Sequence, residues 1–196
     1  MQLFVGLGNP GNKYVNNRHN LGYLIIDKIA LNYNFNKWQN RHRGVVSKGS
    51  IEESDIFLLK PQTFMNLSGT SVAETVRFYK LKPSDVLVFY DEIDLNPGKI
   101  RIKLGGSSAG HNGVRSIEDH IGSDFYRIRI GVGRPEMKKK VESYVLNDFS
   151  SEELSDWVSP LTEIISKKIS PLVLGDHSVF LNQVALEMQN HTNNLT

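Results

Sequence analysis

The sequence predicts a single α/β domain over residues 1–196, built as a twisted, mixed β-sheet flanked by helices on both faces. The chain has 196 residues, the size of one ordinary domain, and contains no internal repeat or low-complexity linker. Strand-length apolar runs alternate along it with stretches of helical periodicity, which is typical of this class. Two late strands alternate aliphatic and cationic residues, so we expect part of the sheet to be antiparallel.

In the first half of the chain, apolar patterning and turn residues predict the elements. The first strand is apolar and ends at a cluster of Gly, Asn and Pro. Asn20 can cap the helix that follows, whose apolar residues recur every three or four positions. The run from Val86 to Tyr90 is apolar throughout, as in a central strand covered on both faces. In order, these elements are a strand near 2–6, a helix near 21–33, strands near 43–48 and 55–60, a helix near 67–80 and a strand over 86–90.

In the second half, strands near 99–104 and 127–130 place aliphatic side chains on one face and cations on the other. If they share a sheet, these cations form a basic patch across two strands. Helices are expected near 112–121, 151–168 and 177–189. A polar, Asn-rich tail follows from about residue 189, and the pattern leaves its order open.

Composition excludes several kinds of site. The chain has no cysteine, so disulfides, thiolate nucleophiles, Cys-ligated zinc and iron–sulfur clusters are ruled out, which fits a reducing compartment. The N-terminal segment lacks the basic start and long apolar run of a signal peptide. The apolar runs are also too short to cross a bilayer. We therefore expect a soluble, cytoplasmic protein without a membrane partner.

Charge is unevenly distributed along the chain. Residues 99–140 carry 10 basic and 4 acidic side chains, a net charge of +6, whereas residues 141–196 carry 2 and 8, a net charge of −6. A basic segment beside an acidic one suggests a polyanionic partner over one face. The alternative is an ordinary solvated surface.

Two short motifs suggest other chemistries. Residues 6–11 match the dinucleotide-binding pattern G-x-G-x-x-G, but no helix opens within the motif to receive a pyrophosphate. Ser108 is the centre of a G-x-S-x-G match, and a serine hydrolase would then need Asp148 or Asp176 with His177 to complete a triad. Matches of this length arise by chance in Gly/Ser loops. A serine hydrolase nevertheless remains the alternative enzyme class.

Residues suited to acid–base chemistry concentrate in four loops. These loops hold Asn9, Tyr14, Arg18, His19 and Asn20; residues 62–66; residues 91–94; and residues 110–113. At least the first and third follow strands, and ligand sites of α/β sheets lie outside the carboxyl ends of strands. With no cysteine and a weak serine motif, we expect water as the nucleophile and a histidine as its base. A carboxylate such as Asp91 could fix the imidazole tautomer, and amide side chains could hold a developing oxyanion.

Together, these segments resemble the bacterial-type peptidyl-tRNA hydrolase family over about residues 1–150. The motifs that carry the resemblance are Gly6-Leu7-Gly8-Asn9-Pro10-Gly11 with Tyr14, Arg18-His19-Asn20 with Gly22, Pro61-Gln62-Thr63-Phe64-Met65-Asn66-Leu67-Ser68-Gly69, Asp91-Glu92-Ile93-Asp94-Leu95 with Pro97-Gly98, Leu104-Gly105-Gly106 with Gly110-His111-Asn112-Gly113, and Arg127-Ile128-Arg129-Ile130-Gly131-Val132-Gly133 with Pro135. The chain departs from the family pattern at Asn16-Asn17 and at Ser107-Ser108-Ala109, and the latter is not a family nucleophile.

The resemblance implies hydrolysis of the ester between a peptide and the 3′ end of tRNA, which recycles tRNA from prematurely released peptidyl-tRNA. It implies His19 as general base supported by Asp91, and Asn9 as the residue that distinguishes N-blocked from free aminoacyl-tRNA. It further implies a monomer without metal or organic cofactor, which contacts the acceptor end and 3′ CCA of peptidyl-tRNA. The implied substrate-binding residues are Asn9, Tyr14, Phe64, Met65, Asn66, His111 and Asn112, and the implied tRNA-phosphate contacts are Lys103 and Arg129.

A non-catalytic alternative also stays open. Organellar relatives that resemble this family act as RNA-splicing partners, so a fold and a basic face do not establish turnover. The presence of Asn9, His19, Asp91 and Asn112 favours an enzyme.

Overall fold

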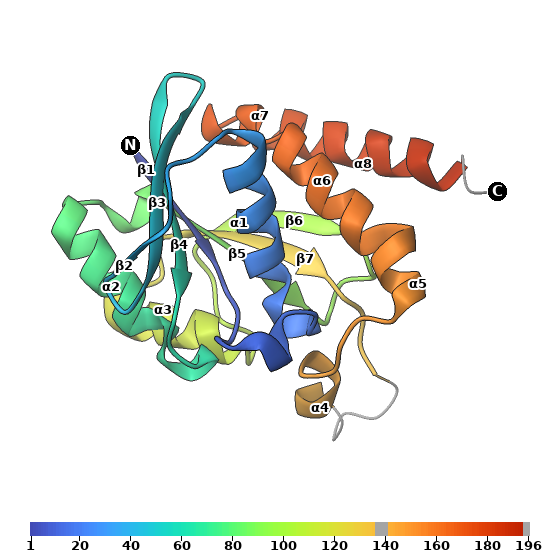
Figure 1. Cartoon of the computed structure of the whole chain (residues 1–196), viewed down its shortest axis with the longest axis horizontal. Helices are drawn as coiled ribbons and strands as arrows, with labels where there is room; N and C mark the ends of the chain where they lie inside the picture. The colour runs from blue at the N-terminus through green and yellow to red at the C-terminus, as the bar shows by residue number, and fades with distance from the viewer. Residues whose placement is uncertain (136–140, 194–196) are drawn as a thin grey trace.

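The computed structural model describes residues 1–135 and 141–193 and contains one central sheet. Its strands are β1 (Gln2–Gly6), β2 (Gln39–Arg41), β3 (Gly44–Ile51), β4 (Ser54–Pro61), β5 (Val86–Glu92), β6 (Ile100–Leu104) and β7 (Tyr126–Gly131). In space they follow the order β2-β3-β4-β1-β5-β7-β6 (Figure 1). The inner strands β4, β1, β5 and β7 are parallel, whereas β2, β3 and β6 pair antiparallel towards the two edges. The prediction of a mixed sheet is confirmed.

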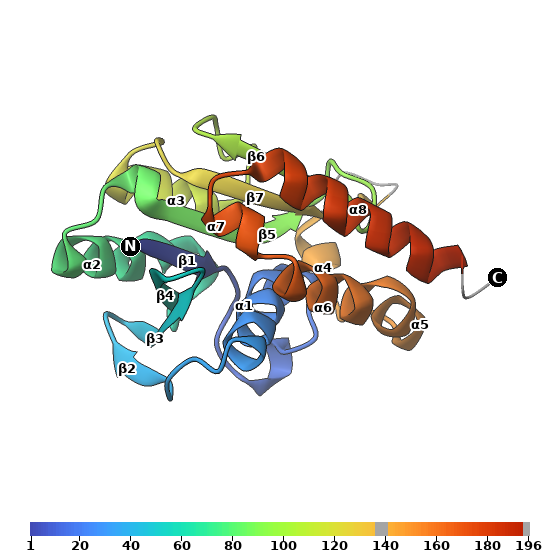
Figure 2. The same ribbon diagram turned by 90° about the horizontal axis from the view of Figure 1, so that it is seen from above.

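Helices cover both faces of the sheet, as predicted (Figure 2). One face packs against α1 (Leu21–Asn32), α6 (Ser159–Lys167), α7 (Ser170–Val173) and α8 (His177–Asn193), and the other against α2 (Ser68–Tyr79) and α3 (Asn112–Ile121). Shorter helical segments are η1 (Asn12–Tyr14), η2 (Arg18–Asn20), η3 (Met65–Leu67), η4 (Pro83–Asp85), α4 (Val141–Val145), α5 (Ser151–Glu153) and the π-helical turn η6 (Leu154–Val158). Within the described ranges, no helix combines the length and apolar character needed to span a membrane.

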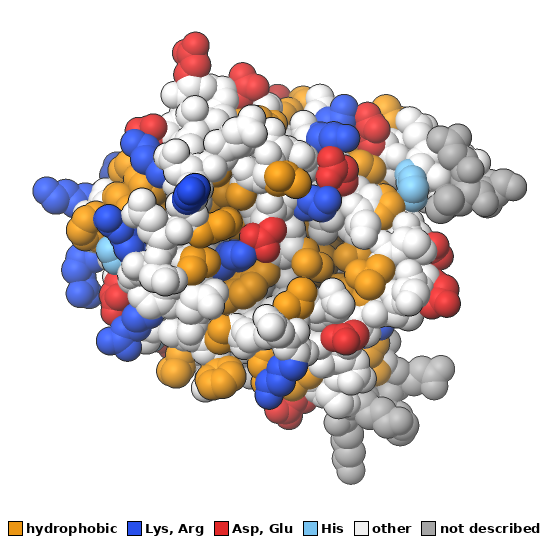
Figure 3. Space-filling model, viewed as in Figure 1, with side chains coloured by type: hydrophobic (Ala, Val, Ile, Leu, Met, Phe, Trp, Pro, Cys, Tyr) orange, Lys and Arg blue, Asp and Glu red, His pale blue; other side chains and the backbone are white. Residues whose placement is uncertain are grey.

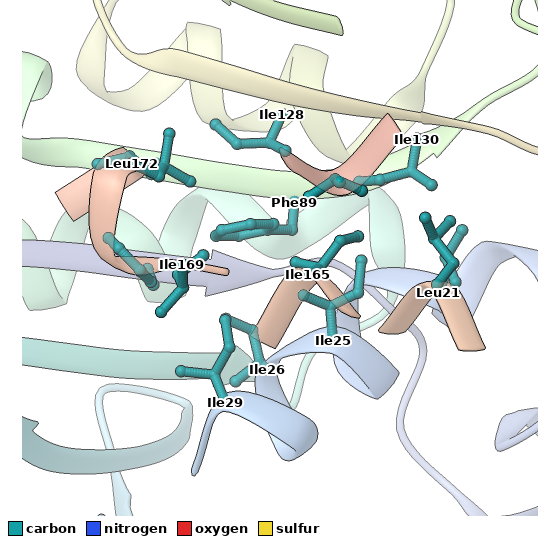
Figure 4. Packing of buried hydrophobic residues seen from close by; sticks show 14 of the residues in the cluster. Leu21, Ile25, Ile26, Ile29, Phe89, Ile128, Ile130, Ile165, Ile169 and Leu172 are labelled. Atoms are coloured by element: carbon teal, nitrogen blue, oxygen red, sulfur yellow. The ribbon is translucent and has the colours of Figure 1, made fainter. Parts of the chain in front are cut away.

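The larger core lies between the sheet and the layer of α1, α6 and α7 (Figure 4). The side chains labelled there are Leu21, Ile25, Ile26, Ile29, Phe89, Ile128, Ile130, Ile165, Ile169 and Leu172. All are essentially inaccessible to solvent, with Leu172 the most exposed at 1%. Burial of each such side chain contributes about 1.5–3 kcal/mol, which makes this layer a main source of stability.

Strand β5 shows why Val86–Tyr90 is apolar throughout. Leu87 and Phe89 belong to the core under α1, whereas Val88 and Tyr90 belong to a second core under α2 and α3. Successive side chains of a strand point to opposite faces, so a strand covered on both sides must be apolar at every position. The predicted central strand is confirmed, and it continues to Glu92.

A close helix–strand contact sets the position of the turn before α1. A Cβ atom on Gly22 would lie 2.3 Å from the Phe89 carbonyl oxygen and 2.4 Å from the Leu7 nitrogen. A Cβ atom on Gly6 would in turn lie 2.4 Å from the Gly22 carbonyl oxygen. Gly6 and Gly22 therefore let α1 approach β1 and β5, whereas Gly11, with φ 108°, lets the chain turn.

The structure departs from the sequence prediction in several elements. The helix expected over 151–168 is divided into α5, η6 and α6. Pro160, at the start of α6, has no N–H to donate to the preceding turn, which is π-helical. The segments β2, α4 and α7 were not predicted, because three to five residues are too few to establish a periodicity. Helix α8 continues to Asn193, beyond its predicted end at residue 189.

A further concentration of cations lies outside the basic segment 99–140. Figure 3 shows Lys and Arg side chains gathering on the side of the molecule where α2 lies. Arg43 in the β2–β3 turn and Arg77 near the end of α2 are both exposed there. The two elements meet where the His42 and Phe78 rings pack with their centroids 4.9 Å apart. Charge counted along the sequence did not reveal this grouping, because it joins segments more than thirty residues apart.

Candidate active site

The four predicted loops meet around one cavity of about 820 Å³ at the carboxyl ends of β1 and β5. Every predicted catalytic and substrate-binding residue lines it: Asn9, Tyr14, His19, Phe64, Met65, Asn66, Asp91, His111 and Asn112. The cavity is bounded on another side by Val141, Glu142, Val145 and Leu146. This last wall comes from a segment in which the sequence indicated no functional residue.

His19 and Asp91 form a buried pair at the base of the cavity. His19 belongs to η2 and Asp91 to the end of β5, and the close packing of α1 on β5 brings them together. Nδ1 of His19 lies 2.9 Å from each Asp91 carboxylate oxygen. The His19 side chain is 12% exposed and that of Asp91 1%. An ionised carboxylate only accepts hydrogen bonds, so Nδ1 carries the proton and Nε2 of neutral His19 is left as an acceptor.

The pair shifts the titration of both groups. Burial disfavours the charged imidazolium, but the charge and hydrogen bond of Asp91 outweigh it and raise the pKa of His19 above its ordinary 6.5. Burial likewise opposes ionisation of Asp91, yet the His19 and His111 imidazoles hold the pKa of this carboxyl well below its usual range. Asp91 is therefore a carboxylate at neutral pH.

His111 binds the same Asp91 carboxylate beside His19. Its Nε2 lies 3.1 Å from Asp91 Oδ1, and its ring centroid lies 4.8 Å from that of His19. Its Nδ1 accepts the backbone N–H of Val114 at 3.3 Å and so caps helix α3. Nδ1 is thus the acceptor and Nε2 the donor, which fixes the tautomer. Both ring nitrogens are occupied, so a contact between His111 and substrate would use the carbon edge or face of the ring.

Asn9 is held so that its amide nitrogen points into the cavity. Its backbone N–H and C=O pair with the Asn20 side-chain amide, each at 2.9 Å, and its Oδ1 accepts the Met65 N–H at 2.8 Å. Because a backbone N–H can only donate, the oxygen must face Met65 and the NH₂ group must face away from it. No described residue accepts a hydrogen bond from that NH₂ group. Asn20 therefore orients Asn9 and does not cap α1 with its side chain as expected.

The other predicted substrate-binding residues differ in exposure. Phe64 is 58% exposed at the mouth of the cavity, whereas Met65 is 5% exposed and packs against Gly113 of α3. Asn66 and Asn112 are exposed amides, from η3 and from the first residue of α3. The loop around Asn66 thus combines an apolar surface with hydrogen-bond donors.

The predicted two-strand basic patch is wrong in part. Lys103 on β6 is exposed, but the facing Arg127 on β7 is buried and bonds to Glu118 of α3 at 2.5 Å. Arg129 is partly exposed, and its Nε donates to Glu92 Oε2 at 2.9 Å. Helix α3 covers the cationic face of β7 but does not cover the edge strand β6 in the same way, which explains the difference. Lys103 is therefore exposed to a ligand. Arg129 bonds to Glu92 through Nε, which leaves its terminal nitrogens for a contact with a ligand.

The serine-hydrolase alternative is not supported. Ser108 lines the cavity, but Asp148, Asp176 and His177 do not. Asp148 accepts from the Asn17 amide, Asp176 caps the start of α8, and His177 packs against Tyr126. A triad around Ser108 is not assembled.

The geometry does not favour a nucleotide site at residues 6–11 or a metal ion at Asp91. The Gly motif at residues 6–11 leads into the short turn η1 instead of a helix N-terminus. Asp91 and the two histidines offer three ligand atoms within 4.8 Å of one another, which a divalent ion could reach. His19 Nδ1 and His111 Nε2 already donate to Asp91, however, so an ion held through these two nitrogens would have to displace both protons.

Comparison with known proteins identifies the family. A sequence model of the family described as peptidyl-tRNA hydrolase matches residues 3–192. A peptidyl-tRNA hydrolase of Cereibacter sphaeroides is 52% identical over 189 residues, which cover 96% of this chain and 84% of the relative. The chain belongs to the peptidyl-tRNA hydrolase family.

Other members of the peptidyl-tRNA hydrolase family agree with this assignment in sequence and in structure. The Nitrobacter winogradskyi protein of that name is 49% identical over 96% of this chain and 93% of its own length. The crystal structure of peptidyl-tRNA hydrolase from Acinetobacter baumannii superposes with a TM-score of 0.87 and 40% identity, covering 94% of each chain. The resemblance drawn from the motifs and the predicted fold class are both confirmed.

Two features of the site had no functional assignment from sequence. Glu92 lines the cavity and orients Arg129, and Arg18 contacts the Tyr144 ring in the segment that forms the far wall. Both residues lie in motifs that carry the family resemblance, but the sequence analysis gave functional roles to their neighbours His19 and Asp91. The available signal was a charged residue directly beside a catalytic candidate, Arg18 before His19 and Glu92 after Asp91.

Proposed function

We infer that this protein is a peptidyl-tRNA hydrolase, which cleaves the ester between a peptide and the 3′ end of tRNA. The observation that carries the chemistry is the buried His19–Asp91 pair, whose Nδ1-to-carboxylate contact leaves Nε2 as a free base. Family membership supplies the substrate class. Hydrolysis in this site needs neither a thiol nor a Ser108 nucleophile.

We propose water as the nucleophile, activated by His19. As the water oxygen bonds to the ester carbonyl carbon, Nε2 takes a proton, and Asp91 stabilises the imidazolium formed. The tetrahedral intermediate collapses with cleavage of the bond to the tRNA 3′ oxygen. That oxygen receives the proton from the imidazolium, which returns the site to its initial state. The products are a tRNA with a 3′ hydroxyl group and a peptide carboxylic acid, which keeps the second proton of the water and releases it to solvent at neutral pH.

The amide side chains are proposed to hold the carbonyl groups of the substrate. Asn66 and Asn112 can donate hydrogen bonds to the carbonyl oxygen of the ester as it becomes anionic. Asn9 can donate its cavity-facing NH₂ group to the first peptide carbonyl of an N-blocked substrate. A free aminoacyl-tRNA presents an α-ammonium there, which cannot accept this hydrogen bond. Tyr14, Phe64 and Met65 supply the surrounding surface, and His111 holds Asp91.

The tRNA body is proposed to lie across the β6 edge. Lys103 is exposed there, and the terminal nitrogens of Arg129 can reach phosphate while its Nε stays on Glu92. The proposal further includes a cytoplasmic monomer of one domain, with the acceptor end and 3′ CCA as the tRNA portion recognised. A metal or organic cofactor has no step in it.

Purified protein incubated with N-acetyl-aminoacyl-tRNA and, in parallel, with unblocked aminoacyl-tRNA tests the function directly. The expected result is rapid release of the N-acetyl-amino acid and slow release of the free amino acid. Binding of both RNAs without release of either would instead support the RNA-binding alternative. Labelling of Ser108 by a fluorophosphonate with loss of activity would overturn the water mechanism.

A further inference from the structure

Helix α4 forms a wall of the cavity although few of its residues are buried. It has five residues, of which only Val145 is buried. Val141, Glu142 and Val145 nevertheless line the cavity, together with Leu146 just after the helix. Figure 1 shows α4 apart from the central sheet. A helix this short has little stability of its own, so contacts with the rest of the protein must fix its place.

Arg18, the residue before His19, supplies many of these contacts. Its Nη1 donates to the carbonyl oxygens of Asp148 at 2.7 Å and Asn147 at 3.3 Å. Its Nη2 bonds to Glu153 Oε2 at 2.6 Å, and its backbone N–H donates to the Asn147 carbonyl at 3.2 Å. The guanidinium also lies 4.5 Å from the centroid of the Tyr144 ring. One buried side chain thus contacts the end of α4, the residues after it, and α5.

Neighbouring contacts run between the same two segments. Asn17 donates to Asp148 Oδ1 at 2.6 Å, and the Phe149 N–H donates to the Asn16 carbonyl oxygen at 2.9 Å. Arg18 differs from these because its charge is buried, at 9% exposure, and has Glu153 as its counter-ion. Removing such a charge leaves its acceptors unpaired in a poorly solvated place. The Arg18 contacts are therefore the part of this junction most sensitive to substitution.

We propose that Arg18 is a positioning residue that fixes the α4 wall beside His19 and so determines how tightly the cavity binds the peptidyl part of the substrate. Because η2 contains both Arg18 and His19, one rigid turn places the base and anchors the wall. The binding of a peptidyl group in the cavity rests on the proposed function. The anchoring of the α4 wall by Arg18 does not depend on it. The planar fork of Arg18 serves two carbonyls and a carboxylate at once, and a lysine ammonium cannot reproduce that geometry.

Hydrogen–deuterium exchange of the full-length protein tests the anchoring without any substrate. The variants are Arg18→Lys, Arg18→Met and Glu153→Gln, with Glu152→Gln as the matched control one residue away in α5. We expect faster exchange over residues 141–149 in the first three, largest for Arg18→Met, and no change for Glu152→Gln. Strand β5 should exchange as in the parent protein in every variant. Unchanged exchange over 141–149 in folded Arg18→Lys and Glu153→Gln would overturn the proposal, whatever Arg18→Met does.

Kinetics separate an effect on the wall from an effect on His19. For N-acetyl-aminoacyl-tRNA, Arg18→Lys should raise KM about 5- to 50-fold, because charge-assisted hydrogen bonds are lost, while kcat changes less. The midpoint of the kcat against pH profile should stay in place, since Asp91 still holds His19. A shifted midpoint with an unchanged KM would overturn the proposal in favour of a direct effect on the base. If the parent protein hydrolyses no tRNA ester, the proposed function fails, and the exchange result alone decides the role of Arg18.

Discussion

At the scale of single residues, the His19–Asp91 contact controls the expected pH dependence. Activity requires neutral His19, and its pKa is raised above 6.5, so kcat should increase with pH through a midpoint above that value. Asp91→Asn removes the charge that raises this pKa. The midpoint should therefore move to lower pH while kcat falls, because the imidazolium formed in the reaction loses its support.

His19→Ala should lower kcat by about 10²–10⁴-fold and leave tRNA binding nearly unchanged. Asp94→Asn is the matched control for Asp91→Asn. Asp94 lies three residues from Asp91, and its side chain is 47% exposed and paired with Arg134. It should leave both kcat and the pH midpoint in place. Near-normal turnover by His19→Ala would exclude this residue as the base.

Asn9→Asp tests selectivity with little disturbance of the site. An aspartate can still accept the Met65 N–H with one oxygen, so the substitution replaces only the cavity-facing donor. The mismatch with the peptide carbonyl should reduce discrimination between blocked and unblocked substrates by roughly 5- to 150-fold. Hydrolysis rates of N-acetyl-aminoacyl-tRNA and aminoacyl-tRNA give the ratio. An unchanged ratio, with circular dichroism showing an intact fold, would place selectivity elsewhere.

At the scale of elements, β6 and β7 carry cations with different roles. Lys103→Ala and Arg129→Ala should each raise KM for peptidyl-tRNA. Each should also reduce the slope of log KM against log salt concentration by roughly 0.7–0.9, because one phosphate contact is lost. Lys167→Ala, an equal change of charge on α6 at a side chain 64% exposed, is the control and should leave the slope unchanged. If all three variants keep the slope of the parent protein, the β6 edge does not bind phosphate.

Arg127, on the same strand as Arg129, is expected to act on stability. Its side chain is 2% exposed and bonds to Glu118, so Arg127→Met leaves a partly buried carboxylate without its partner. The free energy of unfolding should fall by about 3–5 kcal/mol. Lys103→Met, at an exposed position on β6, should change it by less than about 0.5 kcal/mol. Urea denaturation followed by circular dichroism compares the two, and equal effects would contradict the burial of Arg127.

At the scale of the whole molecule, the packing of α1 on the sheet links stability to catalysis. Gly22→Ala would place a methyl group 2.3 Å from the Phe89 carbonyl oxygen, so α1 would have to shift and carry His19 with it. Overpacking of this kind should cost about 1–3 kcal/mol of unfolding free energy and reduce kcat. Alanine otherwise favours helices by about 1 kcal/mol over glycine, so the sign of the change is diagnostic. A stabilised, fully active variant would contradict the close approach.

The sequence by itself determined the features that depend on local pattern and motif order. Periodicity predicted the strands and helices of both halves, because a strand buried on two faces and a helix buried on one leave different spacings of apolar residues. Motif order pointed to the family, and all predicted catalytic and substrate-binding residues do line one cavity. Short segments such as β2 and α7 were not predicted, because they contain too few residues to show a periodicity.

The tertiary structure decided what depends on contacts between distant segments. Alternation marked Arg127 and Arg129 alike as surface cations, and only the covering helix α3 makes one a buried ion pair. The tautomer of His111 follows from Asp91 and the Val114 N–H together, and the partners of Arg18 lie about 130 residues further along the chain. The physical reason is that burial and hydrogen-bond partners are set by whichever segment packs alongside, and local spacing does not encode that segment.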